Sequence, residues 1–226
     1  DEVIVTPRSF IASASCVAVC GATPVFADVD LNSGNLTANT IDKVLTPKTK
    51  AIILVHLGGW PCEMDEILIL AKHHKLAVIE DCAQAHGATY KGSKVGGFGD
   101  IGAWSFCQDK IITTGGEGGM VTTNNVDIWE RGWAYKDHGK NFNTVYHQVH
   151  PTGFRWLHES FGTNLRLTEM QSAIGREALK LMPKWLDKRK RNAQIYNTYL
   201  EECYTLRVIK PPTYSEHAYY RYFVYV

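Results

Sequence analysis

The chain of 226 residues has little net charge, no long hydrophobic run and no closely paired cysteines. Its formal charge of +1 is too small to indicate nucleic acid or an anionic membrane as a partner. No stretch approaches the ~18 uninterrupted apolar residues of a membrane-spanning helix. None of the six cysteines stands in a Cys-x-x-Cys pair, so we expect free and mostly buried thiols in a reducing compartment. His73-His74 has no third ligand at a suitable spacing, so we expect no metal site.

The two ends of the chain have distinctive compositions. The acidic pair Asp1-Glu2 differs from a secretory leader, so we expect a cytoplasmic protein. Residues 1–5 enter a strand at once, and residues 222–226 form an apolar strand at the very end. Complete proteins rarely end in such a strand, because it invites aggregation. We therefore expect the chain to be the middle of a longer polypeptide.

Short apolar runs alternate with helical segments up to about Thr123. The predicted strands are 3–5, 24–29, 51–56, 77–80, 101–106 and 120–123, and the predicted helices between them are 11–20, 40–45 and 64–74. Runs that are apolar throughout indicate strands buried on both faces, and the helical spacers indicate crossovers. The pattern predicts an α/β fold with a mostly parallel sheet between helices. Ligands bind at the carboxyl ends of such strands, where His56, Asp81 and the segment after Phe106 fall.

The second half of the chain has a different pattern. A helix is predicted over 126–136, followed by a long loop over 138–160 that we expect to cover a substrate or reach a neighbouring subunit. Thr168 and Gln171 have the spacing of a capping box, which predicts a helix over 168–182. A separate basic helix is predicted over 185–200, and its charges indicate a solvated face more than a nucleic-acid site.

Lys110 and Asp81 are the strongest candidates for chemistry. Lys110 follows an apolar strand and precedes the glycine-rich turn 115–119, and Asp81 ends the strand 77–80. Pyridoxal phosphate (PLP) needs a lysine amine for its aldehyde and a carboxylate that keeps its pyridine nitrogen protonated. The competing interpretations are an ordinary surface lysine and a helix-capping or ion-paired aspartate. Strand alternation places Asp81 on one face of the sheet and its neighbour Glu80 on the other.

Other residues near these two positions fit the same ligand. Gln84 would donate to a phenolate oxygen, Ser105 would contact a phosphate oxygen, and Phe10 would stack on a planar ring. His86 fits either a pocket wall or a structural role. The glycines of 115–119 predict a tight turn with positive φ and close backbone approach.

Together these segments closely resemble the DegT/StrS family of PLP-dependent nucleotide-sugar aminotransferases. The matching segments are 21–26, 49–53, 55–57, 80–88, 99–102, 105–106, 110, 113–119 and 164–171. The resemblance implies the fold type I, aspartate aminotransferase-like architecture, with a mixed sheet in a large α/β domain and a smaller C-terminal domain. On that basis residues 1–182 would be the large PLP-binding domain. Residues 183–226 would be a linking helix and the start of the small domain.

The resemblance also implies the role of each site residue. Lys110 would be the Schiff-base lysine and Asp81 the partner of the pyridine nitrogen. Gln84 would contact the cofactor hydroxyl, Ser105 the phosphate and Phe10 the ring. The family acts as a homodimer with active sites at the subunit interface, and Asn164 would reach the phosphate of the partner's cofactor.

The implied reaction moves an amino group from L-glutamate to a nucleotide-linked ketosugar, for polysaccharide or natural-product biosynthesis. Related sugar dehydratases carry histidine in place of the lysine, so Lys110 favours amino transfer. A regulatory PLP-fold protein or an inactive fragment would also fit the sequence. A nicotinamide dehydrogenase is disfavoured, because no GxGxxG follows a strand. Trp60 and Cys107-Gln108-Asp109 depart from the commoner pattern and leave the ketosugar open.

Overall fold

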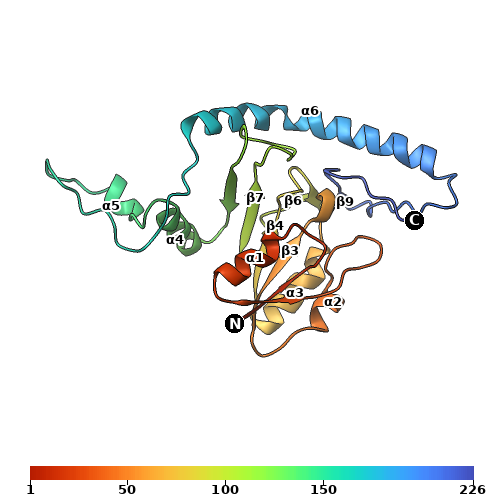
Figure 1. Cartoon of the computed structure of the whole chain (residues 1–226), viewed down its shortest axis with the longest axis horizontal. Coiled ribbons are helices and arrows are strands. Elements are labelled where there is room, and N and C mark those ends of the chain that lie inside the picture. Colours follow the sequence, from red (N-terminus) through yellow and green to blue (C-terminus); the bar gives the residue numbers. More distant parts are fainter.

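The computed structural model describes residues 1–226 (Figure 1). Its main sheet has six strands. Their order is β2-β1-β3-β4-β7-β8, and every neighbouring pair is parallel except β7 with β8. The strands are β1 (Glu2–Val5), β2 (Thr23–Phe26), β3 (Thr49–Val55), β4 (Ala77–Asp81), β7 (Ile101–Ser105) and β8 (Gly119–Thr122). The predicted α/β fold with a mostly parallel mixed sheet is confirmed.

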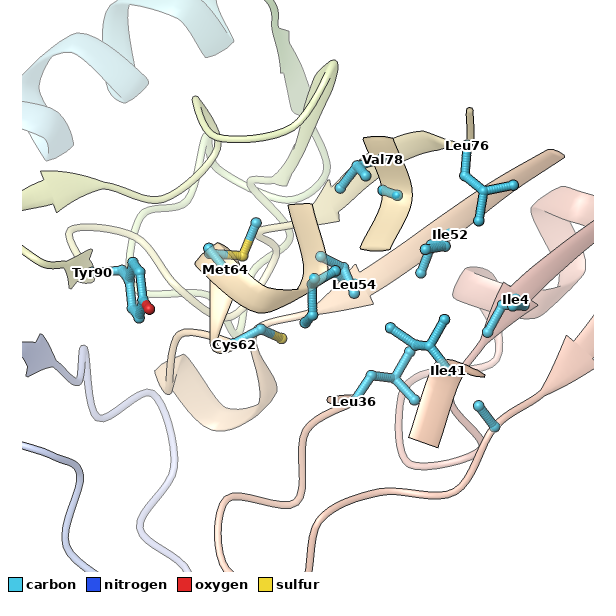
Figure 2. Packing of buried hydrophobic residues seen from close by; sticks show 13 residues of the cluster. Ile4, Leu36, Ile41, Ile52, Leu54, Cys62, Met64, Leu76, Val78 and Tyr90 are labelled. Atoms are coloured by element: carbon cyan, nitrogen blue, oxygen red, sulfur yellow. The ribbon is translucent and has the colours of Figure 1, made fainter. Parts of the chain in front are cut away.

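Helices cover both faces of this sheet. On one face, Ile52 and Leu54 of β3 pack with residues of the helices α2 and α3, and this cluster is the largest part of the core (Figure 2). On the other face, Ile53 packs with Ala14 and Val17 of helix α1. The three helices are α1 (Ala12–Val19), α2 (Ala38–Asp42) and α3 (Met64–His74). A strand that is buried on both faces must be apolar throughout, which explains the continuous runs in the sequence.

Strand β2 ends earlier than predicted. The expected strand ran to residue 29, but β2 stops at Phe26, whose partner Val5 is the last residue of β1. Because β2 is an edge strand with a single neighbour, it loses its partner where β1 ends. The short helix α2 also begins earlier than predicted, at Ala38, behind a capping box formed by Thr37 and Thr40.

One helix replaces the two predicted over 168–182 and 185–200. Helix α6 (Glu169–Leu200) continues through Pro183 and extends along one side of the molecule (Figure 1). Its N-terminal capping box of Thr168 and Gln171 is present as predicted. Pro183 removes one helical hydrogen bond, but Met182 and Leu186, on either side of it, pack against the same hydrophobic cluster. That shared contact explains why the helix continues.

The other departures also concern the second half of the chain. The predicted strand 222–226 is absent, and only an isolated bridge joins Tyr225 to Arg207. The predicted loop 138–160 contains a short helix, α5 (Phe142–Tyr146), after the predicted helix α4 (Val126–Lys136). A small second sheet was not predicted, because its strands are only two residues long. Its strands are β5 (Thr89–Tyr90), β6 (Ser93–Lys94) and β9 (Ser215–Glu216).

The cysteines are free, as predicted, but most are not buried. Only Cys62 and Cys82 are buried, while Cys16 and Cys20 are exposed and the other two are intermediate. The exposed pair lies on or just after α1, a helix whose outer side faces solvent. No helix of the chain combines the length and apolar character that crossing a membrane requires.

Candidate active site

A cavity of about 1020 Å³ lies at the carboxyl ends of the parallel strands. The segments that follow β1, β3, β4 and β7 all contribute to its wall, together with residues 220–223 near the end of the chain. Five of the six predicted site residues line it, namely Phe10, Asp81, Gln84, Ser105 and Lys110. The tertiary structure therefore brings the predicted lysine and carboxylate into one space.

Asp81 is held in the cavity by two donors. The hydroxyl of Ser13 donates to Oδ2 over 2.8 Å, and the backbone N–H of Ala83 donates to Oδ1 over 3.1 Å. Ser13 is buried on α1, which packs over this edge of the sheet. The sequence reasoning missed Ser13. The only indication in the sequence was that Ser13 is a polar residue in a helical stretch of small and apolar residues.

Glu80 points away from the cavity, as strand alternation predicted. Its carboxylate is completely buried and takes hydrogen bonds from the backbone N–H groups of Gly96, Phe98 and Gly99 at 2.7–2.8 Å. The ring of His56 lies 3.0 Å from the same carboxylate. Burial alone would raise the pKa of Glu80, but these hydrogen bonds and the histidine bring the pKa below its ordinary value. His56 therefore has a structural contact and does not face the cavity.

Glu80 and His56 also form a buried cluster with Cys82, in which the potential ligand atoms lie within 4.8 Å of one another. Both oxygens of Glu80 already accept hydrogen bonds. Burial raises the pKa of the Cys82 thiol, which keeps the sulfur protonated. We assign this cluster a structural role.

Lys110 lies in the turn that follows β7. Its side chain is 15% exposed, and its Nζ lies 3.3 Å from Oδ1 of Asp109 and 5.1 Å from the centre of the Tyr220 ring. The Tyr220 hydroxyl donates to the other Asp109 oxygen. This hydrogen bond, followed by the charge of Lys110, lowers the pKa of Asp109 and keeps it ionised. Lys110 is thus partly desolvated, as the sequence indicated, and it has two neighbours that the sequence did not reveal.

Three further predicted residues contribute different groups to the cavity. The Gln84 side-chain oxygen accepts the N–H of Gly58 at 2.7 Å, so its amide NH₂ is the end that remains for a ligand. The Ser105 hydroxyl accepts the N–H of Cys107 at 3.3 Å and retains its own proton as a donor. Phe10 is 71% exposed although it is aromatic, which suits a ring that stacks on a ligand.

The glycine-rich turn has the geometry that its sequence predicts. Gly115 and Gly116 have φ values of 81° and 150°, in the region that favours glycine. A Cβ at Gly118 would lie 2.3 Å from the Thr114 hydroxyl, and one at Gly119 would lie 2.8 Å from the Trp104 carbonyl. Both expected reasons for glycine, positive φ and close approach, are present.

Two residues considered from the sequence lie outside the cavity lining. Asn164 is exposed and its side-chain oxygen accepts the Nε–H of Arg166 at 3.0 Å, so its contact with a partner's cofactor stays a prediction. His86 is buried against Trp104 and Phe106. Burial, and to a lesser extent the charge of Lys110, lowers the pKa of His86 to about 4, so the ring is neutral and structural.

The fold and the cavity define an α/β protein with a lysine–carboxylate site at the carboxyl edge of its sheet. Residues 1–226 match the model of the DegT/DnrJ/EryC1/StrS aminotransferase family. Because the match covers the whole chain, the chain belongs to this family.

Several known proteins are similar to the chain. An aminotransferase from Psychrobacter cryohalolentis, known from an X-ray structure, is 59% identical with a TM-score of 0.97, over 100% of this chain and 59% of its own. The GDP-perosamine synthase of Caulobacter vibrioides is 44% identical over 93% of this chain and 54% of its own length. That of Escherichia coli O157:H7 is 42% identical over 87% and 51%, respectively. The chain thus spans about half the length of the curated relatives it matches.

Proposed function

We propose that the chain carries the catalytic site of a PLP-dependent aminotransferase that moves an amino group from L-glutamate to a nucleotide-linked ketosugar. The supporting observation is the common cavity, which both Lys110 and Asp81 line. Family membership supports amino transfer. Relatives named GDP-perosamine synthase support a nucleotide-linked sugar as the acceptor.

The cavity fits PLP in both size and chemistry. Its volume of about 1020 Å³ is at the upper end of ordinary ligand sites, enough for a cofactor together with part of a substrate. Lys110 would hold the aldehyde carbon, Asp81 the pyridine nitrogen and Gln84 the ring hydroxyl. Ser105 would donate to the phosphate, and Phe10 would cover one face of the ring. The Ser13 hydroxyl, which fixes the Asp81 carboxylate, supports this placement because a fixed anion is needed there.

The residues of the chain have distinct tasks in this reaction. Bound PLP supplies a sink for the electron pair that is left when the donor Cα loses its proton. Lys110, once its amine is free, would take that proton from the donor Cα on Nζ and deliver it to the former aldehyde carbon of the cofactor. Asp81 would keep a proton on the pyridine nitrogen, and Gln84 would donate its amide N–H to the ring oxygen. The ketosugar would then accept the amino group by the same steps in reverse, and Lys110 would again hold the cofactor.

The proposal extends to a homodimer, with Asn164 reaching across to the partner's cofactor. It is supported by the exposed aromatic and apolar side chains in the second half, among them Phe154, Trp156 and Phe161. We also propose that residues 138–160 cover the substrate, and that 1–182 and 183–226 belong to a large and a small domain. Helix α6 would then join the two domains without a break.

Absorbance spectroscopy with added PLP tests the proposal, on this chain and on a longer polypeptide that contains it. We expect a band near ~410–420 nm that fades when L-glutamate is added, which is the behaviour of a lysine-bound PLP that has accepted an amino group. A band in the longer polypeptide alone would mean that this chain is an inactive fragment. A band that L-glutamate leaves unchanged would favour a regulatory PLP-fold protein, and absence of a band in both would overturn the proposal.

A further inference from the structure

The region around Lys110 contains more than the proposed chemistry requires. A lysine amine hangs on a chain of four rotatable bonds, so its position is poorly defined unless other groups hold it. Here Nζ has Asp109 on one side and the ring of Tyr220 on another. Asp109 is 50% exposed, and an exposed ion pair of this kind holds a lysine only weakly. The hydroxyl of Tyr220 fixes the position of this carboxylate by a hydrogen bond, which the ion pair alone does not do.

Tyr220 belongs to a segment that is distant along the chain from the strands but is fixed at their carboxyl ends. Residues 218–221, which we call the strap, hydrogen-bond to the turn after β3: Ala218 N–H donates to Gly59 over 2.8 Å, and Arg221 N–H donates to Gly58 over 3.0 Å. The strap crosses this turn with little space between them, since a Cβ at Gly59 would lie 3.0 Å from the Ala218 side chain. Gln84, a predicted cofactor contact, binds the same turn through Gly58.

Helix α6 holds the strap from the other side. The guanidinium of Arg189 donates from Nη1 to the backbone carbonyls of Tyr219 and Tyr220, at 3.1 and 3.4 Å. Figure 1 shows the C-terminal segment running alongside α6, and a hydrogen bond between Tyr222 and Asn197 joins them further along. Arg189 is partly buried, and no carboxylate pairs with it. Its side-chain hydrogen bonds therefore go to two backbone carbonyls of the strap, one of which belongs to Tyr220.

We propose that Asp109 and Tyr220 form a holding site for the Lys110 amine, and that Arg189 on α6 is a positioning residue that keeps Tyr220 in place. The inference rests on the proposed function, because it concerns the interval in which the amine is free to carry a proton. During that interval the carboxylate and the ring keep Nζ beside the reacting carbon. The Tyr220 hydroxyl donates a hydrogen bond to Asp109, which favours the ionised form of the carboxylate. An amine that is held in position transfers a proton faster than one that must search for its target.

Tyr220→Phe tests the holding site, with Tyr219→Phe as its matched control. Both changes remove one phenolic hydroxyl from the strap, but the Tyr219 hydroxyl makes no hydrogen bond. In the PLP-loaded protein, we expect Tyr220→Phe to slow the single-turnover reaction with L-glutamate by about 10-fold, less than the ~100-fold that a 1 Å displacement of a reacting group costs. The affinity for PLP and the KM for L-glutamate should stay nearly unchanged. An unchanged rate in Tyr220→Phe would overturn the proposal.

A second readout needs neither PLP nor activity. Lys110 is labelled with a neutral amine-selective reagent, and mass spectrometry compares its labelling rate with that of the exposed Lys188 in the same sample. We expect this ratio to rise severalfold in Tyr220→Leu and in Arg189→Met, and to stay constant in Arg191→Met, which changes an exposed arginine on the same helix. Lys140, whose side chain is 23% exposed, reports general opening of the fold in the same sample. If its labelling rate rises together with that of Lys110, only the general stability has changed and the inference fails.

The two readouts separate this inference from the proposed function. A failed reaction with L-glutamate in the unaltered protein counts against the proposed function. The labelling ratio still reports whether the holding site exists. Thermal unfolding of each variant shows whether it is folded, and Tyr220→Phe, which keeps the ring, serves if Tyr220→Leu does not fold. A constant ratio in all folded variants would overturn the inference.

Discussion

Two adjacent carboxylates on β4 have opposite environments. Glu80 is sealed in the interior, where three backbone N–H groups and His56 surround its oxygens. Asp81 faces the cavity and has one hydrogen bond on each oxygen. A carboxylate oxygen has two lone pairs, so Asp81 keeps capacity for a ligand. Burial and saturation of hydrogen bonds, more than residue type, separate the structural acid from the one to which we assign a chemical role.

The neighbours of the two residues also come from different parts of the chain. On the Glu80 side, His56 and the turn of residues 96–99 surround the charge. On the Asp81 side, the neighbours come from segments distant in sequence. Ser13 on α1 hydrogen-bonds to the carboxylate, and Lys110 after β7 and Tyr220 near the end of the chain line the same cavity. Changes on the first side should therefore alter stability, and changes on the second side should alter activity.

The largest effect on the cavity side is expected for Lys110→Ala. Under the proposed function, removing the amine eliminates both the attachment point for PLP and the group that moves the proton, so transamination should be abolished. The stability should change by only about 1 kcal/mol, because the lysine is in a weak, partly exposed ion pair. A transamination assay and a thermal melt measure the two quantities, with Lys188→Ala on α6 as the control. Turnover retained by Lys110→Ala would remove the role that we assign to this residue.

On the sealed side, Glu80→Gln should destabilise the protein by roughly 3–5 kcal/mol, the usual cost of breaking a buried charged network. The new amide NH₂ would face backbone donors that at present have an acceptor. Chemical denaturation measures the change. Whatever fraction remains folded should keep its activity per folded molecule, and loss of activity without loss of stability would contradict the division between the two faces.

Asp81→Asn is the matching change on the open side. The amide has the same shape but no negative charge to keep the pyridine nitrogen protonated, so the rate should fall at least about 100-fold. Stability should fall by less than in Glu80→Gln, because Asp81 has fewer donors to leave unpaired. The same assays apply, and a larger stability loss in Asp81→Asn than in Glu80→Gln would reverse the comparison.

Acid should lower the free energy of unfolding, because two buried histidines are neutral in the folded protein. Burial lowers the pKa of His86 to about 4 and that of His217 to about 3, below the ordinary value of 6.5. Below pH 6.5 the unfolded chain binds protons that the folded chain does not, so stability is present above pH 6.5 and is lost as the pH falls towards these values. At pH 5 each histidine should contribute a loss of roughly 2 kcal/mol relative to neutral pH.

Denaturation at pH 7 and pH 5 measures this slope. We expect His217→Gln to reduce the slope, and His147→Gln, which changes an exposed histidine, to leave it as it is. An equal slope in the His217 variant and the unaltered protein would show that its ring does not stay neutral in the fold.

The smallest effect is expected for Thr168→Ala, outside both faces. Thr168 caps α6 by accepting the N–H of Gln171. Loss of the cap should cost about 1 kcal/mol, with no change in the rate of transamination per folded molecule. Denaturation measures this, and Ser172→Ala serves as a control four residues further on. A large loss of activity would indicate that the start of α6 takes part in the site directly.

Local patterns predicted much of this structure. The apolar runs predicted the strands, because β3 and its neighbours are buried on both faces, and alternation predicted the opposite faces of Glu80 and Asp81. The capping box at Thr168 predicted where α6 begins. The glycines of residues 115–119 predicted the positive φ values that the turn contains. Each of these features depends on residues that lie within a few positions of one another.

The features that the sequence reasoning missed depend on distant contacts. Ser13 meets Asp81 across 68 positions, and Tyr220 meets Asp109 across 111. Pro183 led to the prediction of two helices, because a proline inside a helix is locally unfavourable. Packing of Met182 and Leu186 on one cluster overrides that local preference. The terminal segment 222–226 resembled a strand but uses its side chains on Arg8, Gly58 and Asn197 instead of forming a ladder.

Residue type, periodicity and short-range spacing were enough to predict the α/β architecture and the family, and to select the candidate residues of the site. Which of those residues face the cavity, and which groups hold them, depended on the three-dimensional fold. The fold brings Ser13 into hydrogen-bonding contact with Asp81, and His56 into contact with Glu80. It also brought Tyr220 to Lys110. The physical reason is that hydrogen bonds and charge contacts act over a few ångströms in space, at any separation along the chain.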